Sequence, residues 1–215
     1  MTSRKSEPEQ VTAQDVREAV ALAATTLRTA ADRDWHVAAG GLTWTCWETI
    51  EHIADDLFTY AVQVASANTA PNSHVPVGWR RSRPGGPALT VHAEEGTAPE
   101  GLVQVLAASG GLLAAVVAVA SPQRRAFHTY GVSDPEGFAA MGVVETLVHM
   151  QDIAAGLGLS WTPPEDLCDR VLRRLFRAAP ESAGRWQTLL WATGRAELPG
   201  QARLGAWRWD GTPLT

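Results

Sequence analysis

Two short stretches of this chain carry the same arrangement of ionisable side chains. In each, a glutamate, a histidine and an aspartate follow one another at spacings of four and three residues: Glu48, His52 and Asp55, and then Glu145, His149 and Asp152. Residues four and three apart share one face of an α-helix, so each stretch predicts a polar stripe along a helix. Because imidazoles and carboxylates are metal ligands, two such stripes facing each other would form a pocket for a metal ion.

The donor types favour a site with two imidazoles and one carboxylate, from His52, His149 and Glu145. Both histidines lie within apolar helical stretches rather than in polar ones. Catalytic zinc uses this ligand set and leaves a fourth position for water or substrate, and the set also suits nickel or iron. A cation held this way lowers the pKa of a water or thiol that it binds. The alternative is a pair of solvated helix faces, on which such spacings are common.

The remaining carboxylates of the two stripes are not needed as ligands. Glu48 completes an S/T-x-x-E capping box with Thr45, so we expect it to cap a helix. If Glu48 faced inward instead, the set would become two glutamates and two histidines, as in dinuclear carboxylate sites of helix bundles. Asp55 and Asp152 lie one turn beyond the histidines. We expect them to accept a hydrogen bond from an imidazole N–H and to fix its tautomer.

Further candidates lie near the predicted site in the sequence. His128 precedes the predicted fourth helix and would reach the pocket rim as ligand or acid–base group, or else pack in the core. Trp44 is a candidate pocket wall or helix staple, and Arg80 and Arg81 would bind a substrate carboxylate or lie in a solvated loop. Cys46 opens a helix, where a thiolate is favoured, although a buried thiol is the alternative.

Periodicity predicts the elements that position these residues. Apolar spacing and capping boxes, the last of them Ser133-Asp-Pro-Glu136, predict four long helices and two short ones: 12–31, 45–66, 99–120, 133–157, 164–177 and 186–193. The third helix is so apolar that we expect it to be well buried. Between the second and third lies a loop, 68–99, with a short strand in A-L-T-V-H-A, and 203–210 is expected to be strand or extended.

Bulk properties restrict the class of protein. The chain has 215 residues and a net charge of −5, which gives no argument for a nucleic-acid partner. Two cysteines are too few for a disulfide framework. The N-terminus lacks a signal-peptide pattern, and the most apolar run, Gly110–Ala120, is about half the length needed to span a bilayer. We therefore expect a cytoplasmic protein with no membrane partner.

The two stretches also resemble a known family. L-T-W-T-C-W-E-T-I-E-H-I-A-D-D-L and G-F-A-A-M-G-V-V-E-T-L-V-H-M-Q-D-I-A-A-G-L-G are similar to the second and fourth helices of the DinB-like superfamily. The resemblance is to the N-terminal domain of mycothiol-dependent maleylpyruvate isomerases in particular, and it covers residues 11–159. It implies an all-α fold, with a DinB-like four-helix bundle over 1–159, and metal ligands at His52, Glu145 and His149.

The resemblance further implies a divalent metal, usually zinc, that activates mycothiol for transfer to, or isomerisation of, a small electrophilic substrate. Those isomerases carry a larger second domain, whereas 160–215 would form only a short extension packed on the bundle. Asp152 and Arg195 join His128 as candidate catalytic residues. The alternatives are a hydrolase or tailoring enzyme that uses activated water, and a non-catalytic bundle that binds a metal or small molecule. A homodimer is compatible with a bundle of this size.

Overall fold

The protein is mainly helical. The computed structural model describes residues 10–66 and 72–214, and within them six helices and two small two-stranded sheets are present. In chain order they are α1 (Ala13–Arg28), α2 (Cys46–Ala65), β1 (Arg80–Arg81), β2 (Ala88–Leu89), α3 (Pro99–Val119), β3 (Ala126–His128), β4 (Gly131–Ser133), α4 (Pro135–Leu157), α5 (Glu165–Leu175) and α6 (Arg185–Ala192). The predicted loop at 68–99 begins outside the described residues.

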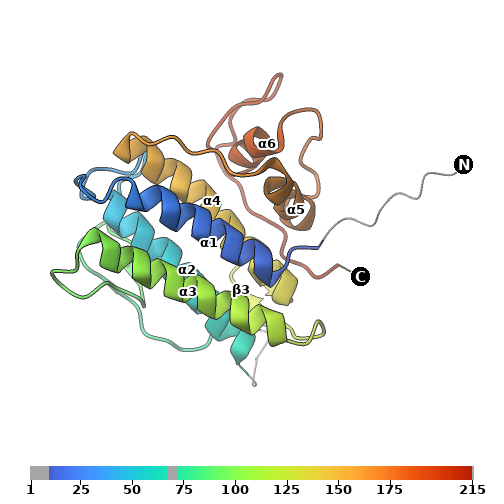
Figure 1. Cartoon of the computed structure of the whole chain (residues 1–215). Coiled ribbons are helices and arrows are strands. Elements are labelled where there is room, and N and C mark those ends of the chain that lie inside the picture. The colour runs from blue at the N-terminus through green and yellow to red at the C-terminus, as the bar shows by residue number, and fades with distance from the viewer. Residues whose placement is uncertain (1–9, 67–71, 215) are drawn as a thin grey trace, which may run out of the picture.

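The four long helices lie side by side, as Figure 1 shows. Helix α2 packs against α3 and α4, and α1 packs against the same two helices from the other side. Helix α4 is buried along nearly its whole length, because α1, α2 and α5 all contact it. The two helices that carry the polar stripes, α2 and α4, are therefore direct neighbours. Helices α5 and α6 pack on each other at the side of α4.

Capping fixes where the long helices begin. The predicted box at α2 is confirmed, since the Thr45 side chain accepts from the Glu48 backbone N–H and the Glu48 carboxylate accepts from the Thr45 N–H. The predicted box at Ser133 is wrong. Because α4 begins at Pro135, Asp134 rather than Ser133 is the N-cap, and its side chain accepts from the Gly137 N–H. The Ser133 hydroxyl instead donates to the carbonyl of Gly211.

Helix α3 is less buried than its composition predicts. Its leucines at 102, 106 and 113 face α1 and α2 and are fully buried. Its opposite face is open, with Leu112 and Val119 exposed, because fewer neighbours cover it. As a whole, α3 has the length and apolarity of a membrane-crossing helix, although the run 110–120 alone is too short to cross a membrane. In its most apolar stretch, 39% is buried inside the protein. One such helix is weak evidence, since core helices share these properties, and the absence of a membrane partner stays a prediction.

The short elements were predicted less well. The strand expected in A-L-T-V-H-A is limited to Ala88–Leu89, which pairs antiparallel with Arg80–Arg81. The hairpin of β3 and β4 was not predicted, because three-residue strands carry too little periodicity. Residues 203–210 contain no strand and run as irregular chain over α5 and α6. The bounds of α5 and α6 agree with the prediction to within two residues.

Candidate metal centre

Two histidines and a glutamate converge between α2 and α4. His52 projects from α2, and Glu145 and His149 project from adjacent turns of α4. One ligand atom from each lies within 4.8 Å of the other two. Nε2 of His149 lies 3.2 Å from Oε2 of Glu145, and Nε2 of His52 lies 3.9 Å from the same oxygen. The three ligands predicted from the sequence therefore form a cluster that could bind a metal.

The spacing of these atoms fits a small divalent cation. With bonds of about 2.0–2.1 Å, a tetrahedral ion holds neighbouring ligand atoms about 3.3 Å apart. The separation between His149 and Glu145 already has this length, that between His52 and Glu145 is 3.9 Å, and all three ligand atoms lie within 4.8 Å of one another. Two imidazoles and a carboxylate suit zinc and leave one position for an incoming group. The residues present therefore fit the cation that the sequence predicts.

The ionisation of the cluster follows from its burial and its internal hydrogen bonds. Burial opposes protonation of His149, but its bonds to Asp152 and Glu145 outweigh burial and raise its pKa. Burial, together with the neighbouring His149, lowers the pKa of His52 to about 4. Burial would raise the pKa of Glu145, yet the bond to His149 and the charges of both histidines lower it. The raised pKa of His149 therefore has its cause in the two carboxylates, Asp152 and Glu145, that contact its ring nitrogens.

Asp152 orients His149 from behind, as predicted. Its Oδ2 lies 3.0 Å from Nδ1 of His149, which leaves Nε2 facing Glu145. The same carboxylate is bound by Arg195, whose Nη2 lies 2.6 Å and whose Nε lies 3.1 Å from its two oxygens. Burial opposes ionisation of Asp152, but these two partners together lower its pKa. Arg195, from the segment after α6, therefore reaches the metal cluster through Asp152.

The predicted partner of His52 is wrong. Asp55 turns away, and its Oδ1 accepts from the backbone N–H groups of Thr90 and Val91, each at 2.7 Å. The neighbouring Asp56 lies beside His52 instead, with Oδ2 3.3 Å from Nε2, the same nitrogen that faces Glu145, so it does not have the tautomer-fixing role predicted for Asp55. Burial and the nearby Glu145 carboxylate raise the pKa of Asp56 well above its ordinary value. The sequence carried this signal in the i, i+4 spacing of His52 and Asp56.

Glu48 does not join the cluster. Its carboxylate accepts from Thr45 N–H and from the Arg83 guanidinium, with both contacts to Arg83 at 2.6 Å. Burial opposes ionisation, but these bonds lower the pKa of Glu48. The inward-facing alternative is therefore wrong, since the capping role and the arginine use both of its oxygens.

Two cavities adjoin the cluster, and each contains one of its histidines. The first, called here the Arg195 cavity, has a volume of about 640 Å³ and is lined by Trp44, His149, Asp152, Arg195 and others. The second, called here the Tyr60 cavity, has a volume of about 430 Å³ and is lined by His52, Asp56, Tyr60, His128 and others. A group that approaches the cluster can therefore be held on either side.

Of the other predicted residues, some lie at the cluster or in an adjoining cavity and the rest do not. Trp44 lies against the cluster, with its ring centroid 4.9 Å from that of His52. His128 is buried, lines the Tyr60 cavity and has its pKa lowered to about 4, mainly by burial. Arg80 and Arg81 are exposed on β1 and line neither cavity. Cys46 is buried, and burial raises the pKa of its thiol to about 11.

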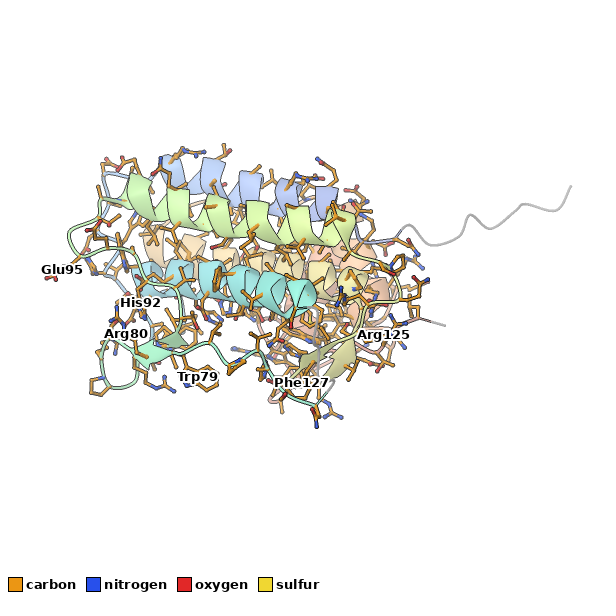
Figure 2. The ribbon with its side chains drawn as sticks, turned by 90° about the horizontal axis from the view of Figure 1, so that it is seen from below. Trp79, Arg80, His92, Glu95, Arg125 and Phe127 are labelled. Atoms are coloured by element: carbon orange, nitrogen blue, oxygen red, sulfur yellow. The ribbon has the colours of Figure 1, made fainter. Side chains whose placement is uncertain are left out.

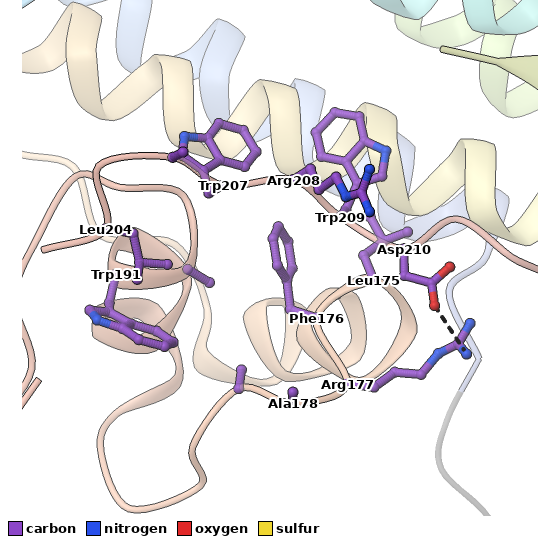
Figure 3. Close-up of a pocket in the computed structure, with 13 residues that line it drawn as sticks. Leu175, Phe176, Arg177, Ala178, Trp191, Leu204, Trp207, Arg208, Trp209 and Asp210 are labelled. Atoms are coloured by element: carbon purple, nitrogen blue, oxygen red, sulfur yellow. Dashed lines mark ion pairs between the residues drawn. The ribbon is translucent and has the colours of Figure 1, made fainter. Parts of the chain in front are cut away.

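A third cavity lies in the C-terminal part of the chain. It has a volume of about 650 Å³ and is walled by aromatic rings, among them Phe176, Trp191 and Trp207, as Figure 3 shows. Arg177 and Asp210 form an ion pair at its rim. None of the predicted site residues lines it, although Trp207 also borders the Arg195 cavity.

Comparison of the chain with protein-family models, with curated proteins and with solved structures finds no match in any of the three.

Proposed function

We propose that this protein is a divalent-metal-dependent enzyme of the DinB-like four-helix-bundle type. In this proposal His52, Glu145 and His149 hold the cation, with zinc as the first candidate. The enzyme activates a low-molecular-weight thiol similar to mycothiol and transfers it to a small electrophilic substrate, or isomerises that substrate. When bound, the cation would lower the pKa of the thiol that it binds.

One observation carries the proposal: the two histidines and the glutamate come together between α2 and α4 in the order in which the DinB-like resemblance lists its ligands. The cluster contains three ligands, and a set of three leaves a position for a reactant, as catalytic sites do. The two adjoining cavities have the room for a thiol and an electrophile, with volumes of about 640 and 430 Å³.

The surrounding residues have distinct parts in this proposal. Asp152, which is bound by Arg195, contacts Nδ1 of His149 and so leaves Nε2 free to face the proposed cation. Asp56, with Oδ2 3.3 Å from Nε2 of His52, is the carboxyl placed to accept the proton that the thiol loses. Trp44 packs edge-on against His52, with its ring centroid 6.5 Å from that of His149, and would restrict the access of water from this side.

The test is a reaction that depends on both metal and thiol. Protein loaded with zinc is incubated with mycothiol and a panel of small uncharged and carboxylated electrophiles, and loss of thiol and formation of product are followed. We expect turnover that disappears without thiol and in His149→Ala. Turnover that proceeds equally well without any thiol would indicate a hydrolase that uses water. Full metal occupancy with no turnover of any kind would indicate a binding protein, and either result would contradict the proposal.

A further inference from the structure

The Tyr60 cavity has the make-up of a small-molecule site. It contains His52 at the metal cluster and extends to Trp79, which is 73% exposed and stands at the mouth. Trp79 and Phe127 lie on the same side of α2 in Figure 2 and both line the cavity. Apolar walls with a few convergent polar groups, in a space of this size, are typical of ligand pockets.

Two of its polar groups have unused hydrogen-bonding capacity. Nδ1 of His128 accepts from Tyr130 N–H, so the neutral ring carries its hydrogen on Nε2. Within the described residues neither this Nε2 nor the hydroxyl of Tyr60 has a hydrogen-bond partner, and neither atom is sealed from solvent. Both side chains are nevertheless more than nine-tenths buried as residues. They offer donors to a molecule that enters the cavity.

The charges that face the cavity exclude an anion. Of the described residues that line it, none is arginine or lysine, whereas Asp55 and Asp56 both contribute carboxyl groups. Apart from a cation held by the cluster itself, a carboxylate placed here would lose its hydration without gaining a cationic partner, and burial of an unpaired charge is strongly unfavourable. The Arg195 cavity differs, because two arginines, Arg195 and Arg203, line it. The Tyr60 cavity thus lacks the cationic side chains that border the Arg195 cavity.

We propose that the Tyr60 cavity binds the electrophilic substrate, and that this substrate is an uncharged, flat aromatic or conjugated molecule with a hydrogen-bond acceptor. The acceptor meets the Tyr60 hydroxyl and the imidazole of His128, while Trp79 and Phe127 cover the ring faces. This inference rests on the proposed function in taking the cavity as the substrate side of the cluster.

The test compares two unreactive probes of the same size and shape, cinnamamide and cinnamate, by calorimetric titration at neutral pH of the zinc-loaded protein and of the same protein stripped of metal by a chelator. The metal-free titration is decisive, because a carboxylate can also bind zinc directly. We expect cinnamamide to bind at least tenfold more tightly, a difference of about 1.4 kcal/mol. Equal binding of the two probes, or tighter binding of cinnamate, would overturn the proposal.

Two variants locate the binding. Trp79→Ala removes an exposed ring, so it leaves the fold intact, and it should weaken cinnamamide binding several-fold, whereas Trp191→Ala makes the same change in the cavity of Figure 3 and should not. Thr59→Arg adds a cation to the cavity and should reverse the preference toward cinnamate, while Gln104→Arg adds it on the exposed face of α3 without effect. Cinnamamide binding unchanged by Trp79→Ala would place the probe elsewhere and refute the assignment.

The binding test does not depend on the metal chemistry. His149 lines the Arg195 cavity and not the Tyr60 cavity, so His149→Ala should lose the metal and keep the preference for cinnamamide. If the protein proves to bind no metal but still prefers cinnamamide, the proposed enzymatic function is contradicted, whereas the proposed binding site for an uncharged molecule is supported. If metal-dependent thiol chemistry is found but the preference for cinnamamide is absent, the proposed binding site is contradicted, whereas the proposed enzymatic function is supported.

Discussion

Arg195 and Asp152 form a two-point contact that joins the C-terminal segment to the metal cluster. The guanidinium binds both carboxylate oxygens, at 2.6 and 3.1 Å, and the same carboxylate lies 3.0 Å from Nδ1 of His149. A fixed carboxylate behind a ligating imidazole sets its tautomer and raises its basicity as a ligand. The segment after α6 therefore contributes to the site without supplying a ligand.

The first prediction concerns this contact. Arg195→Ala and Asp152→Asn should each weaken zinc binding by about 10- to 100-fold, because His149 loses its orienting partner. Zinc affinity is measured by competition with a chromophoric chelator. Arg173→Ala, which removes an exposed arginine on α5, is the control and should leave the affinity unchanged. Unaltered affinity in Asp152→Asn would contradict the orienting role.

The second prediction concerns pH. Zinc needs neutral imidazoles, so protons compete with it. The pKa of His149 is raised above 6.5 and that of His52 is lowered to about 4, so between about pH 5 and 6.5 only His149 carries a competing proton. Zinc affinity should fall about tenfold per unit as the pH decreases through this window, with release of one proton per ion. Calorimetry in two buffers of different ionisation enthalpy counts the protons, and a count of two or none would disagree with these pKa shifts.

The third prediction separates a cap from a ligand. Glu48→Ala removes half of the capping box of α2 and should lower the free energy of unfolding by about 1 kcal/mol. Urea titration measures this loss, and the metal content of the variant should equal that of the unaltered protein. Loss of metal with unchanged stability would instead assign Glu48 to the cluster.

The fourth prediction tests the packing of α4 at its C-terminal end. A Cβ at Gly156 would overlap the carbonyl oxygen of Ala38 and lie 2.7 Å from Sγ of Cys46. Gly156→Ala should therefore lower the free energy of unfolding by about 1–3 kcal/mol. At Gly111, on the exposed face of α3, nothing lies within 4 Å of a Cβ, and Gly111→Ala should stabilise the protein by up to about 1 kcal/mol. Equal effects of the two substitutions would be inconsistent with this packing.

The long helices were predictable because their signals are local. Capping at Thr45 and apolar spacing along each helix depend on residues a few positions apart. The burial of α3 was not predictable in this way, since composition cannot say how many neighbours cover a helix, and one face of α3 is left open. The division of the chain into 1–159 and 160–215 remains a prediction.

The candidate site was predictable to a similar degree. The convergence of His52, Glu145 and His149 followed from repeated spacing on two helices that turned out to be neighbours. Asp55 and Asp56 both have helical spacings that would place them beside His52, and spacing alone could not decide between them. Adjacent residues differ by about a hundred degrees around the helix, so the orientation of α2 decides which one faces inward. The contact of Arg195 with Asp152 joins residues far apart in the chain, and no local pattern encodes it.

The proposed chemistry depends on one divalent cation held by His52, Glu145 and His149. The most direct test is elemental analysis of the purified protein by mass spectrometry, beside His52→Ala and His149→Ala variants shown to be folded by circular dichroism. We expect about one equivalent of a divalent metal, zinc foremost, in the unaltered protein and almost none in either variant. An unaltered protein without stoichiometric metal after exposure to zinc, or variants that retain the full equivalent, would contradict this assignment.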